Sequence, residues 1–367
     1  MKWQWKLGNF AGIDVYVHAT FLLLIGWVGY SHWLENQLWS EVFSGILFIL
    51  ALFACVVLHE YGHALTARKY GIKTRDITLY PIGGVARLER MPEKPVEELW
   101  VALMGPAVNG VIAAALFTFL YLTNSLVPLS DLTVASGSFL ERLMMINISL
   151  VLFNLIPAFP MDGGRVLRAF LAMRMDYVRA TQIAATIGQG MALLFGLIGL
   201  FGNASLLFIA FFIWIGASQE AGMTQMKNAI SGIPVGRAML TDYKSLSPRD
   251  PLSRMAQLIL AGTQHDFPVI DENTRVVGVV TRDDFLAALT QHGQNVAVSS
   301  VMRGNLPEVD SYEMVENALL RIQESGVPAL PVTHAGTLVG IITSENITEY
   351  LMIRSALKAS GVVIVPA

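Results

Sequence analysis

The sequence contains few charged side chains. They make up 14% of the 367 residues, against about 25% in ordinary soluble domains. The formal net charge is −3, so the basic excess typical of nucleic-acid-binding proteins is missing and no such partner is expected. The single cysteine, Cys55, excludes an intramolecular disulfide and is read as a small apolar packing group. Hydrophobic residues reach 54% and the mean hydropathy is +0.53, which indicates a membrane setting.

Apolar runs near the length of a membrane span occur about six times before residue 225. They predict a polytopic α-helical membrane protein of about six transmembrane helices. The first run is short and the fourth ends at prolines, so these two boundaries are the least defined. The amino-terminal segment lacks the cleavage-site pattern of a secretory signal and is expected to be retained. The expected spans are Ala19–Trp33, Val42–Leu65, Leu99–Leu122, Phe139–Leu155, Thr181–Phe201 and Ser205–Ala221.

Basic residues lie on alternate sides of these spans and predict the orientation in the bilayer. The segments 34–41, 123–138 and 202–204 contain no Lys or Arg, whereas the other connections are rich in them. Both termini are therefore expected on the cytoplasmic side of the cell membrane. The basic residues of that side are Lys2, Lys6, Arg68, Lys69, Lys73, Arg75, Arg87, Arg90, Lys94, Arg165, Arg168, Arg174, Arg179, Lys227 and Arg237.

The sequence His59-Glu60-Tyr61-Gly62-His63 ends the second apolar run, near its cytoplasmic end. On a helix, residues four apart differ by about 40° around the axis, so the two imidazoles face one way. Glu60 is near enough to reach a metal-bound water without being a ligand, as in the HExxH motif of zinc hydrolases. The alternative is a polar cluster that reaches toward the interface from a helix end. Two histidines at this spacing, with a glutamate between them, favour the metal site.

A zinc hydrolase needs three protein ligands and one open position, and no third His or Glu follows this motif at the short spacings of soluble metalloproteases. The best candidate is Asp162, which lies far downstream. Pro157 and Pro160 are expected to break the fourth span, and Gly163-Gly164 to let the backbone turn at membrane depth. The alternative for Asp162 is to cap the helix that starts after Gly163.

These motifs resemble those of the site-2 proteases, which are intramembrane zinc metalloproteases. The family pairs HExxH on one transmembrane helix with N-x-x-P-x-x-P-x-D-G on a later one, here Asn154 to Gly163, and has a G-P-x-x-N element, here Gly105 to Asn109. The resemblance covers about residues 10–225. It implies one zinc ion per chain held by His59, His63 and Asp162, and a zinc-activated water deprotonated by Glu60 as catalytic base.

Two amide side chains, Asn154 and Asn109, are candidates for stabilising the oxyanion or binding substrate, since preorganised donors stabilise a developing oxyanion. The alternative for Asn109 is an interhelical hydrogen bond in the small-residue interface Gly105–Gly110. His18, at the start of the first span, is read as a structural interfacial histidine and not as a ligand.

Residues 76–89 are too short to span the bilayer as a helix, and their alternation around Pro81 to Gly84 predicts a β-hairpin. The family has a membrane-associated β element here. Pairing of an unwound substrate with this element is the favoured interpretation, and an ordinary cytoplasmic hairpin is the alternative.

The composition changes after about residue 228, so the sequence predicts a membrane domain at 1–227 and a soluble α/β module at 228–367. This module contains an internal repeat: Met239 matches Met302, and Gly278 to Asp284 matches Gly340 to Asn346. Each copy is expected to form strand, helix, two strands and helix. The repeat resembles a tandem CBS pair, with copies at about 234–292 and 297–355.

In the CBS family, the stretch that contains the matched Thr and Asp or Asn lines a cleft for adenosine-type ligands such as ATP or AMP. The resemblance implies that Thr281, Asp284, Thr343 and Asn346 bind phosphate and ribose there. Asn346 stands where Asp is commoner, which weakens ribose binding in the second copy. A homodimer through the CBS pairs is compatible with the resemblance, although no particular residue argues for it.

Together these features predict a CBS-regulated intramembrane zinc endopeptidase that cleaves peptide bonds in or near transmembrane segments of membrane proteins. The alternative is a CBS-regulated ion channel or transporter. That class predicts inverted repeats of membrane topology, which the sequence does not show, and the zinc site already uses both conspicuous intramembrane acids, Glu60 and Asp162.

Overall fold

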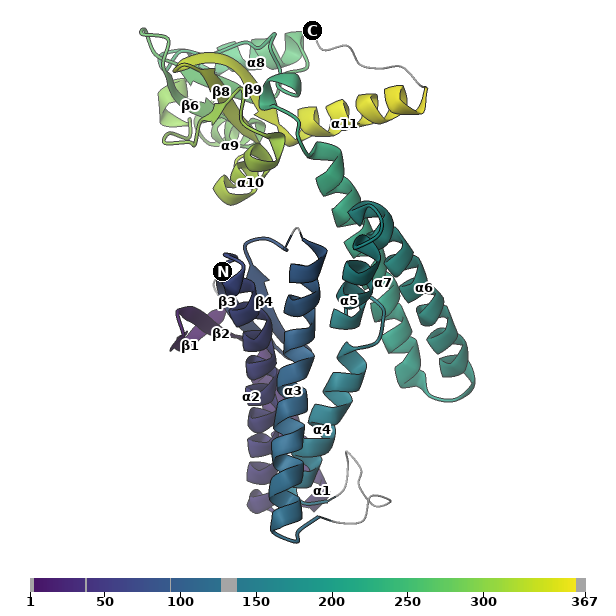
Figure 1. The fold of residues 1–367 in the computed structure, drawn as a ribbon. Helices are drawn as coiled ribbons and strands as arrows, with labels where there is room; N and C mark the ends of the chain where they lie inside the picture. The colour runs from purple at the N-terminus through teal and green to yellow at the C-terminus, as the bar shows by residue number, and fades with distance from the viewer. Residues whose placement is uncertain (1–2, 37, 93, 127–136, 361–367) are drawn as a thin grey trace. The chain divides into compact units, whose positions relative to one another are not determined.

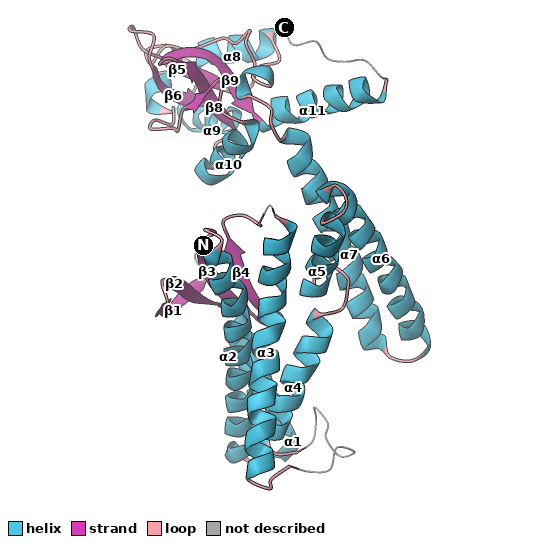
Figure 2. Ribbon diagram, viewed as in Figure 1, coloured by secondary structure: helices cyan, strands magenta, loops and turns pink. Residues whose placement is uncertain are grey.

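The computed structural model describes residues 3–36, 38–92, 94–126 and 137–360. The chain divides into two compact units, Met1–Thr224 and Gln225–Ala367. The first unit holds a four-stranded sheet and the long apolar helices, and the second holds shorter helices around two small sheets (Figures 1 and 2).

All six expected apolar segments of the first unit are helical. Four of these helices are long and apolar enough to cross a membrane within the described residues, whereas α1 and α4 have 17 and 16 residues and are shorter. The fold class is confirmed, with four helices of full spanning length where about six were expected. The helices are α1 (Thr20–Asn36), α2 (Trp39–Lys69), α3 (Pro95–Leu122), α4 (Phe139–Asn154), α6 (Tyr177–Phe201) and α7 (Ala204–Ile230).

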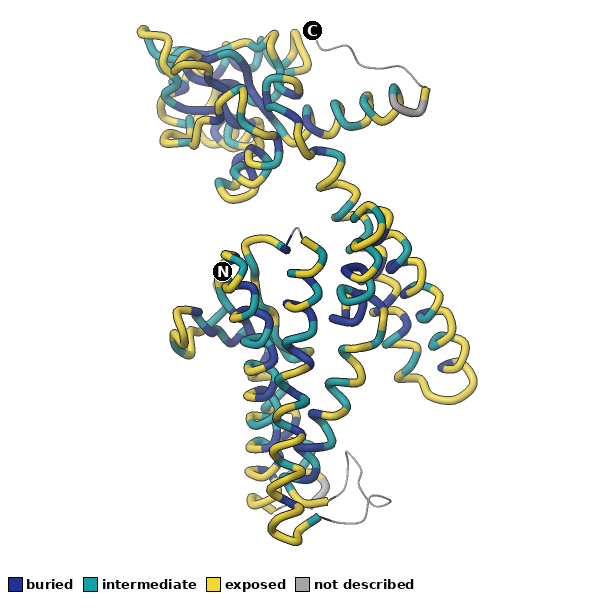
Figure 3. The backbone as a smooth tube through the Cα atoms, viewed as in Figure 1, coloured by how far each residue is buried: buried dark blue, intermediate teal, exposed yellow. Residues whose placement is uncertain are grey.

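The outward faces of these helices carry large apolar side chains, among them Leu23, Trp27, Phe43, Phe208 and Phe211, which are all more than 60% exposed. Figure 3 shows such exposed positions repeating along the helices. An apolar surface of this extent is incompatible with water and is typical of a surface in contact with lipid.

The sheet of the first unit has the order β1-β2-β3-β4, with strands β1 (Gln4–Phe10), β2 (Ile13–His18), β3 (Thr74–Tyr80) and β4 (Gly83–Leu88). The antiparallel pair β3–β4 confirms the expected hairpin. The hairpin β1–β2 was not expected, and β2 pairs with β3 in parallel. A parallel pair needs a long crossover connection, which α1 and α2 provide, and Val17 and Leu79 of the sheet pack against Phe21 and Phe53 of these helices.

The break after α4 differs in detail from expectation. Helix α5 (Asp162–Ala172) begins at Asp162, whose side chain does not cap it. Neither Gly163 nor Gly164 has a positive φ, and both lie inside helix α5. The expectation that the backbone turns at these glycines is therefore wrong. They allow close packing instead: a Cβ on Gly163 would lie 2.2 Å from the Ile156 carbonyl oxygen, and one on Gly164 2.6 Å from the Ala158 carbonyl carbon.

In the second unit the two copies are similar but not equal. The second copy has the five expected elements, β7 (Val309–Asp310), α10 (Val315–Ser325), β8 (Ala329–His334), β9 (Thr337–Thr343) and α11 (Ser344–Ala359). The first has α8 (Leu252–Ala261), β5 (Phe267–Ile270), β6 (Val276–Val280) and α9 (Arg282–His292). Its expected first strand is reduced to a single bridge between Leu246 and Val269, so that expectation is wrong.

Two isolated β-bridges join the two copies. Leu240, near the start of the first copy, pairs with Ile341 of β9, and Arg303, near the start of the second copy, pairs with Val279 of β6. These bridges connect the two copies within one compact unit.

Candidate metal centre

The two histidines lie on the last third of α2, where the helix is packed against α3. Both are buried, with 7% of His59 and 5% of His63 exposed. Asp162, at the first position of α5, is 7% exposed. The structure thus brings together the three residues that the sequence proposes as ligands, although 103 residues separate His59 from Asp162.

Three side-chain atoms converge at one point. His59 Nε2 and His63 Nε2 each lie 3.2 Å from Asp162 Oδ2, and the two nitrogens are 3.1 Å apart. Ligands at about 2.0–2.2 Å from a tetrahedral zinc ion are roughly 3.3 Å from one another, so this triangle has the size of one face of a zinc site. Among the described residues, no other group of three His, Cys, Asp or Glu side chains has this geometry.

The hydrogen bonds behind the histidines determine which nitrogen faces the point of convergence. His63 Nδ1 lies 2.7 Å from the Val101 carbonyl oxygen, and His59 Nδ1 lies 2.5 Å from Asn109 Oδ1. Both oxygens only accept, so each neutral ring donates from Nδ1 and directs the lone pair of Nε2 at the carboxylate. Lone pairs and an anionic oxygen at about 3 Å repel one another unless a cation lies between them, so this donor set fits a metal ion.

Asn109 is itself oriented by a further contact, since its Nδ2 donates to Asn147 Oδ1 at 2.8 Å. Both amides are fully buried. Asn147 also donates to the Leu143 carbonyl oxygen at 2.8 Å. These contacts correspond to the interhelical alternative for Asn109, whose Oδ1 faces Nδ1 of His59, on the opposite side of the ring from Asp162.

The groups of α3 that contact the two histidines lie on one face of the helix. Val101, Gly105 and Asn109 follow one another at a spacing of four residues, which aligns them along the helix. A Cβ on Gly105 would lie 2.2 Å from His63 Nε2 and 2.7 Å from His59 Nε2. The absence of a side chain at Gly105 therefore leaves the space that the two ligand atoms occupy.

Glu60 faces the sheet. Its Oε2 accepts a hydrogen bond of 3.1 Å from the Ala86 N–H of β4. A Cβ on Gly84 would lie 2.9 Å from Glu60 Cγ, so the glycine lets this strand lie directly against the carboxylate. Strand β4 thereby orients the carboxylate beside the two histidines.

The other amide candidate and His18 are placed differently. Asn154 is half-buried at the end of α4, and its side chain forms no hydrogen bond within the described part of the chain. His18 stacks on Tyr80 and its Nδ1 lies 2.8 Å from Thr20 Oγ1. This agrees with a structural role for His18.

The candidate nucleotide-binding residues of the CBS pair contact one another. Thr281 Oγ1 donates to Asp284 Oδ2 at 2.6 Å, and Thr343 Oγ1 donates to Asn346 Oδ1 at 2.8 Å. Each threonine also accepts from the backbone N–H three residues on, at the start of α9 or α11. Asp284 forms an additional ion pair with Arg303, at 2.6 and 2.8 Å.

Asp284 has a lowered pKa as a result. Partial burial acts to raise the pKa, but the hydrogen bonds from Arg303 and Thr281, together with the Arg303 charge, outweigh burial and hold the pKa of this carboxyl below its ordinary value. Sequence reasoning missed Arg303, since nothing in its local sequence distinguishes it from a solvated surface arginine.

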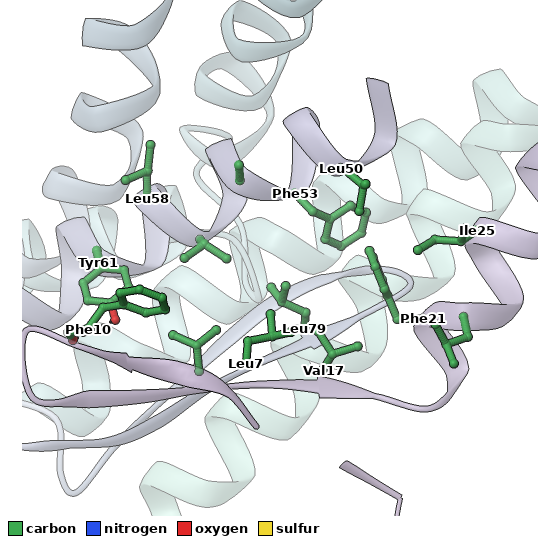
Figure 4. A pocket seen from close by; sticks show the side chains of 14 residues that line it. Leu7, Phe10, Val17, Phe21, Ile25, Leu50, Phe53, Leu58, Tyr61 and Leu79 are labelled. Atoms are coloured by element: carbon green, nitrogen blue, oxygen red, sulfur yellow. Dashed lines mark hydrogen bonds between the residues drawn. The ribbon is translucent and has the colours of Figure 1, made fainter. Parts of the chain in front are cut away.

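An apolar hollow of about 750 Å³ lies between the sheet and helices α1 and α2. Figure 4 shows Phe21, Phe53 and Leu79 directed into it, with Tyr61 and Phe10 at one end. The Tyr61 hydroxyl donates to the Phe10 carbonyl oxygen at 2.9 Å. The lining otherwise offers no polar side chain, so the chemistry belongs to the histidines on the other face of α2.

Comparisons with known proteins agree with the membrane fold and the CBS pair. The model of peptidase family M50 matches residues 47–136 and 128–196, and the CBS domain model matches residues 235–291 and 298–353. A zinc metalloprotease of Methanocaldococcus jannaschii is 32% identical over 355 residues, which cover 96% of this chain and 97% of the relative. A Synechocystis protein assigned as a zinc metalloprotease is 29% identical, with 96% of each chain covered.

Among solved structures, a site-2 protease from Methanocaldococcus jannaschii is 37% identical, with 60% of this chain and 95% of that chain covered and a TM-score of 0.44. The family model and the relatives named zinc metalloproteases define the class of this chain as a zinc metalloprotease. The chain belongs to peptidase family M50, the site-2 proteases, and carries a tandem pair of CBS domains. The channel or transporter alternative finds no support in these relatives.

Proposed function

We propose that this protein is an intramembrane zinc endopeptidase that hydrolyses peptide bonds in or near transmembrane segments of membrane proteins. The observation that carries the proposal is the triangle of His59, His63 and Asp162 ligand atoms, 3.1–3.2 Å on a side, next to Glu60 on an apolar helix. The exposed apolar side chains on the outside of this domain support a substrate that is itself a membrane protein.

The roles of the residues follow from their positions. His59, His63 and Asp162 would hold one zinc ion, which when bound supplies a Lewis acid and lowers the pKa of water. Glu60 accepts the proton of the attacking water and delivers it to the leaving amine. Ala86 keeps one carboxylate oxygen in place through its N–H, which leaves the other oxygen for proton transfer.

A Glu60→Gln variant tests the enzymatic part. It should keep one zinc ion per chain and lose cleavage of a model transmembrane substrate, since the amide cannot accept the proton. Glu41→Gln, on the exposed first turn of the same helix, is the matched control and should cleave normally. Cleavage by Glu60→Gln at the control rate would contradict the proposal.

We further propose that the substrate segment unwinds and pairs with β4. This strand is the last in the sheet order, and its Ala86 N–H points to Glu60 and not to β3. Backbone pairing at such an edge presents an extended peptide beside the catalytic carboxylate. Asn154, at the end of α4, is retained as a candidate for contact with the substrate or the oxyanion.

Crosslinking tests the docking of substrate at β4. In the Glu60→Gln background, Val85→Cys is expected to form a disulfide with a single-cysteine substrate, because Val85 lies exposed on β4. Lys6→Cys, on β1 at the other edge of the sheet, is the control. Equal crosslinking from both positions would argue against docking at β4.

The orientation with both termini in the cytoplasm is proposed from the basic residues, and it brings the CBS pair and the metal centre to the same side of the membrane. Reporter fusions at the carboxyl terminus and within residues 127–136 should report opposite sides. Reporter signals from the same side would contradict the orientation.

We propose that the CBS pair regulates proteolysis by binding an adenine nucleotide through Thr281, Asp284, Thr343 and Asn346. The threonines lie at the starts of α9 and α11, where helix N-termini favour phosphate. Cleavage rates with and without ATP or AMP, in wild type and Asp284→Ala, test this. A rate that never changes would leave the pair as a scaffold, and a sedimentation measurement would show whether it forms a homodimer.

A further inference from the structure

A buried charged cluster near the metal centre plays no part in the proposed mechanism. Arg168 of α5 is only 1% exposed, and Glu98 of α3 is 2% exposed. Arg168 donates from Nε to Glu98 Oε1 at 2.8 Å and also from Nη2, and donates from Nη1 to Glu220 of α7 at 2.5 Å. The guanidinium lies over the rings of Phe159 and Tyr177, at 5.0 and 4.9 Å from their centroids.

Stability alone is a weak reason for this cluster. One arginine faces two carboxylates, and Glu98 Oε2 has no hydrogen-bond partner among the described residues. The desolvation of buried charges offsets much of their attraction, and well-packed apolar residues often stabilise a protein as well or better. Such a cluster does fix a direction, because the planar guanidinium donates its hydrogen bonds only in set directions.

Arg168 shares its helix with the ligand Asp162. The two residues are six positions apart, which corresponds to about 9 Å along the helix axis. Helix α5 has only 11 residues and no side-chain cap at its start, and the contact of Asp162 with Arg165, at 3.9 Å, lies within the same helix. The Arg168 contacts, in contrast, connect α5 to α3 and α7 through charged side chains.

The partner on α3 belongs to the face that orients the histidines. Glu98, Val101, Gly105 and Asn109 succeed one another at intervals of three and four residues, so they share one face of α3. Val101 and Asn109 orient His63 and His59, and Glu98 holds α5. A single helix thus positions all three ligands with respect to one another.

The partner on α7 supports the same segment from outside. A Cβ on Gly216 would lie 2.5 Å from Pro160 Cδ, so α7 packs closely on the loop before Asp162, one turn away from the Glu220 contact. Helix α7 continues to Ile230, so its last residues belong to the sequence of the second unit, which begins at Gln225.

We propose that Arg168 is a positioning residue that holds Asp162 at the two histidines, and that Glu220 makes this position depend on α7. The inference rests on the proposed zinc site. It assigns α7 as the element through which changes outside the membrane domain reach a metal ligand.

The test uses the full-length protein and measures zinc retention against a chelator, which is independent of cleavage. Arg168→Met should lose zinc about 10–100-fold more readily than wild type, the range typical when a partner that orients a ligand is removed. Arg142→Met is the matched control, because Arg142 lies on α4 and not on α5, and its guanidinium lies over the Phe48 ring of α2. The Co²⁺-substituted protein adds a signature of geometry: its visible absorption should change in Arg168→Met and not in the control.

Two milder variants keep the proposal testable if Arg168→Met fails to fold. Arg168→Lys keeps the charge but cannot reach both carboxylates, and should still retain zinc at least about 10-fold less well than wild type. Glu220→Gln, whose side chain is 27% exposed, should fold and show a smaller loss, of about 3–10-fold.

The outcomes separate the two proposals. Wild-type protein that retains no zinc would overturn the proposed function. Zinc retention and Co²⁺ spectra equal to wild type in folded Arg168→Met or Arg168→Lys would overturn only the positioning role. Wild-type retention in Glu220→Gln alone would overturn the link to α7.

Discussion

Asp162 in the membrane domain and Asp284 in the CBS pair are both aspartates in the first turn of a helix, yet their carboxylates meet opposite surroundings. Asp162 Oδ2 faces only the Nε2 atoms of His59 and His63. Asp284 is held by Thr281 and by two hydrogen bonds from Arg303. The difference shows which carboxylate is open to a metal ion: no cationic side chain lies within hydrogen-bond distance of Asp162 Oδ2 among the described residues, whereas Arg303 occupies both oxygens of Asp284.

The largest expected effect tests the metal side of this comparison. Asp162→Asn replaces the anionic ligand atom with a neutral amide, so zinc retention should fall by more than about 100-fold, beyond the effect of losing an outer partner, and cleavage should be lost with it. Chelator competition measures the change. Asp176→Asn, at the cap of α6, is the control; similar losses in both variants would contradict a ligand role for Asp162.

A second variant fills the space beside the two histidine nitrogens and leaves the charge of Asp162 unchanged. Gly105→Ala would place a methyl group 2.2 Å from His63 Nε2, so zinc retention and cleavage should fall by about 10–100-fold. Gly110→Ala on the same helix has no atom within 4 Å of the added methyl and should leave both unchanged. Zinc content and cleavage are measured together, and unchanged zinc in Gly105→Ala would show that the ligand atoms lie elsewhere.

The smallest effect concerns the CBS aspartate. Since the folded-state pKa of Asp284 is lowered, the ion pair with Arg303 stabilises the fold above about pH 4, the ordinary aspartate range, and this contribution is lost as the pH falls through the folded-state pKa. Both partners are partly exposed, so the contribution is at most about 1 kcal/mol. Arg303→Gln should lower the unfolding temperature of the CBS pair by a few degrees at pH 7.

The same variant should unfold closer to wild type as the pH is lowered. Lys244→Gln, which removes an exposed pair with Asp242, serves as the control. A difference between Arg303→Gln and wild type that grows toward acid pH would reverse the assigned sign.

The sequence predicted those parts of the molecule that rest on local periodicity. Apolar runs locate the helices, the spacing of His59 and His63 places both rings on one face, and the repeat locates the two CBS copies. Hairpin β1–β2 was missed because β2 pairs with a strand that follows two intervening helices, and only β2 of the two strands is buried.

Sequence patterns also could not predict the hydrogen-bond partners around the candidate metal centre. The acceptor for His63 is the backbone carbonyl of Val101, a group that every residue possesses. The partners of Arg168 lie 70 and 52 residues away on separate helices, and only the packing of α3, α5 and α7 brings them together.

The position of the ligands along the chain has a consequence for biosynthesis. Both histidines, Glu60 and the orienting groups of α3 are made before residue 110, whereas the proposed third ligand, Asp162, follows residue 110 by 52 residues. At 5–20 residues per second, a nascent chain carries two oriented histidines and the glutamate for roughly 3 to 10 seconds before the third ligand is made. The order of synthesis thus delays the completion of a protease that shares its membrane with other unfinished chains.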